Sequence, residues 1–487
     1  MSNLKIFFKD TVIYGLASIT PRLVSFVLVP IHTSALSTDL YSINTNYYVY
    51  AVFLNALLTL GMETAFFRFF SKEASPDKVI STSFLILCST AIIFLGFAWP
   101  LADSLAQYFG FPDPFFIKLL ALTIFFDTLV VIPFAYLRAK GKSIQFASLK
   151  IVSVLITLLL NIWLLLWLPQ SNMPWTFLPS FINRIPEVSD IFIANLFASI
   201  LTFLMFLSYV KNMSWRFDKT LSKKMLKYGI PIMMAGIAYA INENLDKLLI
   251  ARFLGDDVNG MYAGCYKLGV FMSLYVMTFR LGAEPFFFNI YGKEGSEKLY
   301  SRILTWFVIL ACLCLMTITG FVDFFAGILL KRESYLKALE IVPFILLANL
   351  FLGIYNNLSV WYKVKDKTAV GMFISISGAI LTIILLVLLL PKVGYMGAAY
   401  TTLIVYFFMA TTSYLLGKRY FPIPYETGKV LSYILIATSI AFVSFYMFRG
   451  NLLVNFGLII GFIGLVYYFE KEGLQQLFQK VEENKAP

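Results

Sequence analysis

The chain has 487 residues, of which 59% are hydrophobic and only 14% are charged, and its mean hydropathy is +0.79. A soluble protein carries about 25% charged residues, so this composition excludes a soluble globular chain and predicts a polytopic membrane protein. The net charge of +12 does not indicate a nucleic-acid partner, because a bias of Lys and Arg toward cytoplasmic loops explains it.

Fourteen apolar spans follow one another along the chain, each long enough to cross a bilayer as a helix. The predicted spans are Val12–Leu36, Tyr47–Phe67, Val79–Trp99, Phe115–Leu137, Phe146–Leu168, Val188–Val210, Met225–Ile250, Met261–Phe279, Leu304–Phe321, Leu339–Trp361, Ala369–Leu390, Met396–Leu416, Val430–Phe448 and Leu452–Phe469. The sequence therefore predicts an all-α polytopic membrane protein with about 14 transmembrane helices.

The stretch from Tyr228 to Glu294 repeats the plan of the first part of the chain. The matching segments, given as first and second copy, are Tyr14-Gly15 and Tyr228-Gly229, Leu36-Ser37-Thr38-Asp39 and Gly255-Asp256-Asp257, Gly61-Met62-Glu63 and Gly282-Ala283-Glu284, and, more weakly, Tyr136–Ser143 and Trp361–Thr368. The copies of the opening stretch lie roughly 214 to 221 positions apart and are separated by six spans. An even number of spans predicts a parallel repeat, a typical transporter architecture.

The repeat predicts two pseudo-symmetric six-helix lobes and two extra helices. We expect an N-terminal lobe over 1–210, a basic cytoplasmic linker over 211–227, a C-terminal lobe over 228–417, and two further transmembrane helices with a cytoplasmic tail over 418–487. Proline interrupts the first span at Pro21 and the seventh at Pro231. These matching positions indicate hinge points for lobe rocking, although packing alone also explains a single bend.

Lys and Arg alternate between the two sets of connecting segments. One set, which includes both termini, holds 26 of them and the other holds 8, so both termini are expected in the cytoplasm. The pair Lys331-Arg332 is an exception, because it lies in a segment assigned to the outer side.

Several charged residues fall inside the spans, where a charge costs at least about 2.5–3.5 kcal/mol and faces a cavity or a partner. In one interpretation, Arg22, Lys247, Lys267 and Arg280 line a cationic cavity that binds an anionic substrate. Guanidinium groups suit phosphate because their planar fork bonds two oxygens at once.

In the other interpretation the same charges form static pairs. Arg22 would then pair with Asp127, and Arg280 with Glu284, four residues further along the helix. Glu243 and Lys247 have the same spacing and could neutralise each other. Asp127, central in the fourth span, is also the better candidate for coupling transport to a proton or a sodium ion.

Catalytic and cofactor motifs are not evident in the sequence. It contains no glycine-rich phosphate loop, no nucleophile–base set and no metal-ligand spacing, and its single histidine, His32, ends the first span, where we expect an interfacial side chain. We therefore expect a protein that is not an enzyme and needs no cofactor or metal.

One run of motifs resembles a known family. Asp246-Lys247-Leu248-Leu249-Ile250, Phe253-Leu254-Gly255, Gly260-Met261-Tyr262 and Tyr266-Lys267-Leu268 are similar to the seventh-to-eighth helix signature of Wzx-type polysaccharide flippases. These belong to the multidrug/oligosaccharidyl-lipid/polysaccharide (MOP) exporter superfamily. Val29-Pro30-Ile31-His32-Thr33 and Leu40-Tyr41-Ser42 resemble the matching first hairpin, with Ser42 where glycine is usual.

The resemblance implies a function. The cargo would be an oligosaccharide on undecaprenyl pyrophosphate (an O-antigen, capsule or exopolysaccharide unit), moved from the cytoplasmic to the outer leaflet of the bacterial inner membrane by alternating access. Arginines of the first and eighth helices, here Arg22 and Arg280, would face a cationic cavity, and the last two helices would border a groove for the prenyl tail. We expect a monomer in contact with membrane lipids and no nucleic acid. A cation-coupled multidrug or metabolite antiporter of the same superfamily is the alternative.

Overall fold

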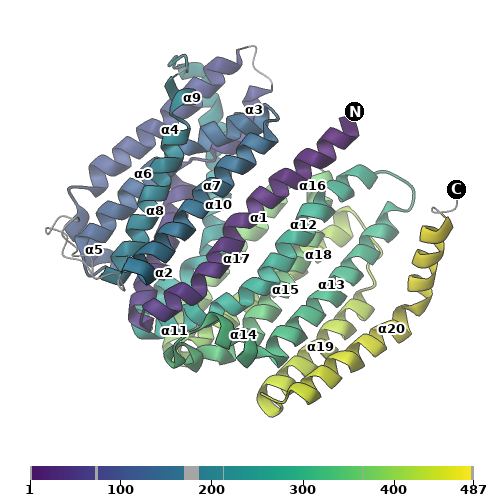
Figure 1. Cartoon of the computed structure of the whole chain (residues 1–487). Helices are drawn as coiled ribbons and strands as arrows, with labels where there is room; N and C mark the ends of the chain where they lie inside the picture. Colours follow the sequence, from purple (N-terminus) through teal and green to yellow (C-terminus); the bar gives the residue numbers. More distant parts are fainter. Residues whose placement is uncertain (1–2, 72–74, 169–185, 212, 366, 484–487) are drawn as a thin grey trace. The chain divides into compact units, whose positions relative to one another are not determined.

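The structure is a computed structural model that describes residues 3–71, 75–168, 186–211, 213–365 and 367–483 (Figure 1). Every regular element in these ranges is a helix, which confirms the predicted all-α class. The predicted outer loop Pro169–Glu187 falls for most of its length outside the described residues, as does the Lys72-Glu73 pair near the end of the first repeat copy.

Helices occur at all the predicted spans. Those of the first seven spans are α1 (Asn3–Ala35), α2 (Thr38–Leu58) continued by α3 (Met62–Phe70), α4 (Pro76–Ala98), α6 (Pro114–Ala139), α7 (Ser143–Ile162), α8 (Pro186–Met205) and α10 (Lys219–Leu254). Those of the second seven are α11 (Asp256–Tyr266) continued by α12 (Val270–Ile290), α13 (Ser296–Gly320), α15 (Val342–Leu358) continued by α16 (Val360–Val364), α17 (Thr368–Val393), α18 (Met396–Tyr420), α19 (Thr427–Met447) and α20 (Leu452–Glu483). Shorter helices are α5 (Ala102–Phe109), α9 (Leu207–Lys211) and α14 (Val322–Leu329).

Eleven helices or helix runs of the described residues are long and apolar enough to cross a membrane. The chain is therefore a multi-pass membrane protein. Three predicted spans, Val12–Leu36, Met225–Ile250 and Met261–Phe279, are not among the eleven, although each coincides with helix. The count of 14 transmembrane helices thus stays a prediction.

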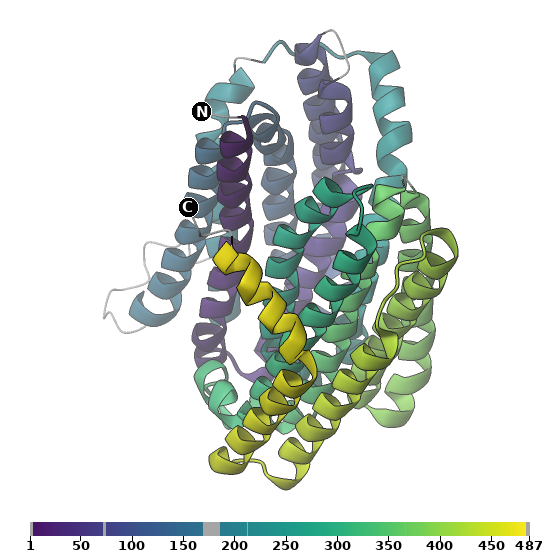
Figure 2. The same cartoon turned by 90° about the vertical axis from the view of Figure 1, so that its right-hand side faces the viewer.

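The helices form two compact units. Unit 1 comprises residues 1–267, 329–338 and 372–405, and unit 2 comprises residues 268–328, 339–371 and 406–487. In unit 1, α1 packs against α7, α6 packs between α4 and α8, and α2 packs against both α10 and α11. In unit 2, α13 packs against α15 and α19, while α19 and α20 form the hairpin drawn in yellow-green and yellow in Figure 2. The lobe limits predicted at residues 210 and 228 stay a prediction.

The first helix of each repeat copy runs on through its proline. Pro21 lies inside α1 and Pro231 inside α10, so neither residue ends its helix, and the hinge role stays a prediction. α10 begins at Lys219, within the predicted basic linker, because Asp218 caps it. The Asp218 carboxylate accepts the backbone N–H groups of Leu221 and Thr220, both at 2.9 Å, and these hydrogen bonds hold its pKa below the usual range.

Arg332 has a structural role that accounts for its place in a segment with few expected cations. Its guanidinium donates to the backbone oxygens of Ser34 at 2.9 Å and Ala35 at 2.7 Å. These are among the last carbonyl groups of α1, which have no partner within the helix. A cation there also complements the negative end of the helix dipole. The exception to the charge pattern therefore caps a helix.

The N-terminal ends of α2 and α11 cross inside unit 1, at the two turns that the sequence matches as repeat copies. A Cβ atom on Gly260 would lie 1.7 Å from the backbone oxygen of Thr38, so only glycine permits this approach. The Ser42 hydroxyl donates to Asp256 at 2.6 Å and accepts from Asn259 at 2.7 Å. The serine that replaces the usual glycine thus bonds directly to the second copy.

A second close approach joins the same two copies. Gly61 separates α2 from α3 and has the left-handed φ of +64°. A Cβ atom there would lie 2.4 Å from the backbone oxygen of Gly229 in α10. Both glycines belong to the repeated motifs, so these motifs mark places where two helix backbones touch.

An ion pair also recurs in each copy. Arg138 of α6 donates to Glu63 of α3 at 2.7 Å in unit 1, and Lys363 of α16 donates to Glu284 of α12 at 2.6 Å in unit 2. Glu63 corresponds to Glu284 in the repeat, and Arg138 corresponds to Lys363 in the weaker match between Tyr136–Ser143 and Trp361–Thr368. Two matched pairs that are joined in the same way support a duplicated architecture.

The crossing of α2 and α11 can be tested through Gly260. Because a methyl group has no room against the Thr38 carbonyl, Gly260→Ala is expected to lower the stability by about 2 kcal/mol. Gly457→Ala is the control, since a Cβ atom added to this α20 glycine would have no neighbour within 4 Å and alanine favours a helix. The measurement is the thermal unfolding midpoint of both purified variants. Equal midpoints would contradict the close approach.

Candidate functional site

Lys247 of α10 is held in a buried ionic cluster within unit 1. Its ammonium lies 2.8 Å and 3.0 Å from the two carboxylate oxygens of Asp246 and 3.0 Å from the backbone oxygen of Glu243. The Tyr262 hydroxyl donates to Asp246 at 2.7 Å, and the centre of the Tyr266 ring lies 3.7 Å from the ammonium. The side chains of both ions are less than a tenth exposed. This cluster is satisfied without a ligand.

Lys267 lies in the turn between α11 and α12, and its side chain is partly buried. Within the part of the chain that the structure describes, it makes no hydrogen bond or ion pair, and it is acted on by the like charge of Lys247. Its charge in turn acts on His32 of α1. Lys267 is therefore a cation with no acid among the charges that act on it.

His32 is not the interfacial side chain that the sequence predicts. It is 6% exposed, and its Nε2 atom lies 2.9 Å from the Oδ1 atom of Asn161 in α7. A buried imidazole needs such a partner because an unpaired polar group is costly away from water. The prediction was wrong because the last turn of α1 packs inside unit 1 rather than at its surface.

Asp127 of α6 is partly buried and accepts a hydrogen bond from the Ser199 hydroxyl of α8 at 2.7 Å. The closest cation that acts on it is Lys150 of α7, whose ammonium also lies 4.7 Å from the centre of the Phe134 ring. Asp127 is therefore a carboxylate with one neutral hydrogen bond and one nearby cation.

Arg22 lies on α1 and its side chain is exposed. It makes no hydrogen bond or ion pair with any residue in the described ranges, and the partners of Asp127 are Ser199 and Lys150. The static pair between Arg22 and Asp127 is therefore not formed. The guanidinium of Arg22 is available to a ligand in the middle of an apolar helix.

Arg280 of α12 is likewise exposed, in unit 2. It borders a small cavity of about 10 Å³ that Asn357, Glu284 and Lys363 also line, with room for about one water molecule. Glu284 pairs with Lys363 at 2.6 Å, so the static pair between Arg280 and Glu284 is not formed. Two predicted arginine partners are thus bound to other residues.

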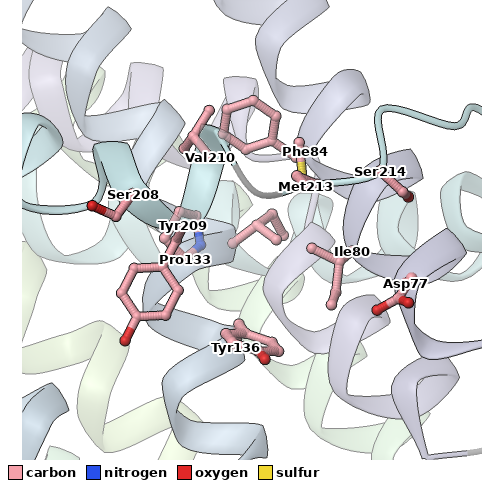
Figure 3. Close-up of a pocket in the computed structure, with 11 residues that line it drawn as sticks. Asp77, Ile80, Phe84, Pro133, Tyr136, Ser208, Tyr209, Val210, Met213 and Ser214 are labelled. Atoms are coloured by element: carbon pink, nitrogen blue, oxygen red, sulfur yellow. The ribbon is translucent and has the colours of Figure 1, made fainter.

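The cavity drawn in Figure 3 differs from the surroundings of Arg22, Lys267 and Arg280 in that no cation lines it within the described residues. It encloses about 440 Å³ between α4, α6, α9 and the segment that follows α9. Asp77 and Ser214 lie on its right in the figure, and Ser208 and Tyr209 on its left. The only charged side chain of its described lining is the carboxylate of Asp77, so this cavity does not suit a pyrophosphate.

Three features of the site were not predicted. The sequence places Lys150 inside a span but gives it no partner, and it does not show that Ser199 bonds Asp127 or that Asn161 bonds His32. The pairing of Lys363 with Glu284 could have been predicted from the repeat, because these two residues correspond to Arg138 and Glu63 in the first copy. Contacts between helices far apart in the chain have no such signal.

The fold is that of the MOP-superfamily exporters. The structure of the lipid II flippase MurJ in an inward closed conformation matches with a TM-score of 0.73 at 16% identity, over 95% of this chain and all of that one. An inward-facing multidrug resistance MATE transporter of the MOP superfamily matches with a TM-score of 0.64 at 14% identity, over 82% of this chain and 94% of that one. A MOP superfamily transporter from Pyrococcus furiosus, described as having a binding pocket of reversed polarity, gives 0.59 at 13% identity, over 84% and 95%. At these identities the likeness concerns the fold.

The family follows from the sequence itself. The model of the polysaccharide biosynthesis protein family matches residues 7–290, and the MatE model matches residues 231–388. The chain therefore belongs to the polysaccharide biosynthesis protein family, and the predicted MOP-superfamily membership is confirmed. The Wzx subtype stays a prediction. None of the curated proteins matches the chain in sequence.

The role of Lys247 can be separated from that of the free cations. Asp246→Asn would leave a buried ammonium without its acid, which is expected to cost about 3–5 kcal/mol. The double variant Asp246→Asn with Lys247→Met removes both charges and should recover a large part of that loss. The measurement is thermal unfolding in detergent. If Asp246→Asn were as stable as the parent protein, the pair would not hold this end of α10.

Proposed function

We propose that the protein is a flippase that moves an undecaprenyl-pyrophosphate-linked oligosaccharide, such as an O-antigen, capsule or exopolysaccharide unit, from the cytoplasmic to the outer leaflet. Membership of the polysaccharide biosynthesis family supports a role in glycan assembly. The fold shared with a lipid II flippase supports a lipid-linked cargo. The protein would act as a carrier rather than an enzyme and reside, as a monomer, in the bacterial inner membrane with both termini in the cytoplasm.

The observation that carries this proposal is the state of the embedded charges. Arg22 and Arg280 are exposed on apolar helices, while the acids predicted to neutralise them, Asp127 and Glu284, have other partners. A pyrophosphate provides several oxygens that a guanidinium can bond in pairs. Lys267 adds a third cation without an acid among its described neighbours, whereas Lys247 is proposed to be structural because Asp246 neutralises it.

Transport would proceed by alternating access of the two six-helix lobes, residues 1–210 and 228–417. The crossing of α2 and α11 joins one helix from each lobe, near the end that the charge pattern assigns to the outside. Opening toward the outer leaflet would require this contact to separate. The hydrogen bonds that Ser42 makes with Asp256 and Asn259 across this contact can be replaced by hydrogen bonds to water. Separation at these residues therefore breaks no ion pair.

Replacement of the arginines tests the proposal. Arg22→Ala and Arg280→Ala are each expected to reduce glycan export roughly tenfold, because each removes a charge-assisted contact to the cargo. Lysine at either position should keep part of the activity, since it retains the charge without the fork. The measurement is surface glycan in cells that depend on this protein, normalised to its amount in the membrane.

Arg419→Ala is the matched control, because Arg419 is a basic residue at the end of α18 whose guanidinium lies over Tyr420 and which does not line the cavity beside Arg280. It should export normally. If the double variant Arg22→Ala with Arg280→Ala also exported normally while it inserted in the membrane, these residues would not bind the cargo.

The alternative, a cation-coupled antiporter, is favoured by the MatE match over residues 231–388. Asp127 is the candidate coupling residue in either case. If proton or sodium gradients drive export through it, Asp127→Asn should abolish gradient-driven transport while Ser199 keeps a hydrogen-bond partner. The measurement is uptake into inverted membrane vesicles with an imposed gradient. Transport by Asp127→Asn that still follows the gradient would exclude this role.

A further inference from the structure

A large apolar pocket lies on unit 1, and none of the residues proposed to bind the cargo lines it. It encloses about 770 Å³, well within the range of pockets that hold small-molecule ligands. α2, α4, α5, α6 and α10 all contribute to its walls, among them Leu54 and Phe109. Helix ends from α4, α5 and α10 meet there, at the end that the charge pattern assigns to the outside.

The lining offers no hydrogen bond to a ligand along most of its length. Only Tyr50 and Thr90 carry a polar atom in their side chains, and the Thr90 hydroxyl donates to the backbone oxygens of Leu58 and Leu87, both at 3.0 Å. The Tyr50 ring packs against that of Phe109, with centroids 4.5 Å apart. A polar cargo has nothing to bond in this pocket, whereas a hydrocarbon chain fits it.

The rim of the pocket is open and apolar. The lining residues Ile93 and Phe97 of α4 are 71% and 56% exposed, and Leu57 of α2 is 46% exposed. Exposed side chains of this kind in a membrane-spanning helix face lipid. The pocket is therefore accessible from the bilayer.

Cations lie beside its outer end. The Arg252 guanidinium at the end of α10 lies 5.8 Å from the centre of the Tyr108 ring of α5, and the Lys118 ammonium of α6 lies 5.7 Å from that of Trp99. Neither cation pairs with an acid in the described ranges. Amphipathic rings and cations of this kind occupy the headgroup level of a bilayer. Both cations belong to the set of eight that the charge pattern assigns to the outer side.

We propose that this pocket binds an anionic phospholipid of the outer leaflet, with one acyl chain in the pocket and the phosphate at Arg252. Apolar walls, a lipid-facing rim and unneutralised cations at the headgroup level match the three parts of such a lipid. The proposal does not depend on the cargo, because none of the residues proposed to bind it lines the pocket.

The test measures bound lipid by native mass spectrometry of the purified protein, after exchange with phosphatidylglycerol or phosphatidylcholine. The parent protein should retain more phosphatidylglycerol than phosphatidylcholine. Arg252→Gln should reduce this preference roughly fivefold, the factor expected for one basic residue near an anionic surface. Arg419→Gln is the control, since its guanidinium lies 5.9 Å from the Tyr420 ring, in almost the same geometry, but far along the chain from the pocket.

A second variant fills the pocket itself. Leu54→Trp should lower the number of retained phosphatidylglycerol molecules by one, whereas Leu435→Trp, at a 66% exposed position on α19, should not. Equal retention of both lipids, unchanged by Arg252→Gln, would overturn the proposal. Displacement of phosphatidylglycerol by undecaprenyl phosphate would also overturn it, because the occupant would then be a prenyl chain.

Discussion

The close approach of two helix backbones at Gly260 is the constraint on which unit 1 depends. No side chain larger than hydrogen can stand between α11 and the Thr38 carbonyl, so the two helix ends meet directly. The amide and hydroxyl groups of Ser42, Asn46 and Asn259 then bond one another across the contact, at 2.7 to 3.2 Å. Small residues that permit contact and polar residues that direct it are the two means by which helices associate where lipid supplies no hydrophobic force.

This contact also explains why α10 and α11, which open the second repeat copy, belong to the same compact unit as the first copy. Glycines at both ends of the crossing, Gly260 near one and Gly61 against Gly229 near the other, hold α10 and α11 against α2 along much of its length. A carrier must be able to release one such contact at a time. Backbone approaches and hydrogen bonds donated by hydroxyl and amide groups are suited to that, since these polar groups can bond water after the contact opens.

The sequence predicts a great deal of this architecture because membrane helices must be long and apolar. All the predicted spans coincide with helices, and the repeat motifs Gly-Met-Glu and Gly-Ala-Glu prove to mark equivalent ion pairs through Glu63 and Glu284. The burial of His32 could not be predicted from hydropathy or from the repeat. Its partner Asn161 is 129 positions away, and only the packing of α1 on α7 brings the two together.

The apolar pocket shows a related limit. Hydropathy gives Phe109 and Leu245, which line the pocket, the same value as leucines and phenylalanines that pack fully or face lipid. The difference lies in the space left between α2, α4 and α10, which depends on helix positions and not on composition. Charges are easier to interpret, because each embedded one must find a partner or face water. That is why the sequence could single out Arg22 and Arg280 as candidates but could not decide between binding and static pairing.

The pattern of pairing now favours binding on energetic grounds. If Arg22 and Arg280 were already bonded to Asp127 and Glu284, an incoming pyrophosphate would have to break those pairs and leave two acids unneutralised, which costs several kcal/mol for each buried ion. Instead, Glu284 pairs with Lys363, while both arginines remain exposed. Asp127 accepts a hydrogen bond from Ser199 and has Lys150 as its nearby cation. An anion can then bind guanidinium groups that need no rearrangement, and it removes the cost of embedding them. Under the proposed function, free acids at these positions would repel the anion, so the bonding of Asp127 and Glu284 to other groups would favour its binding.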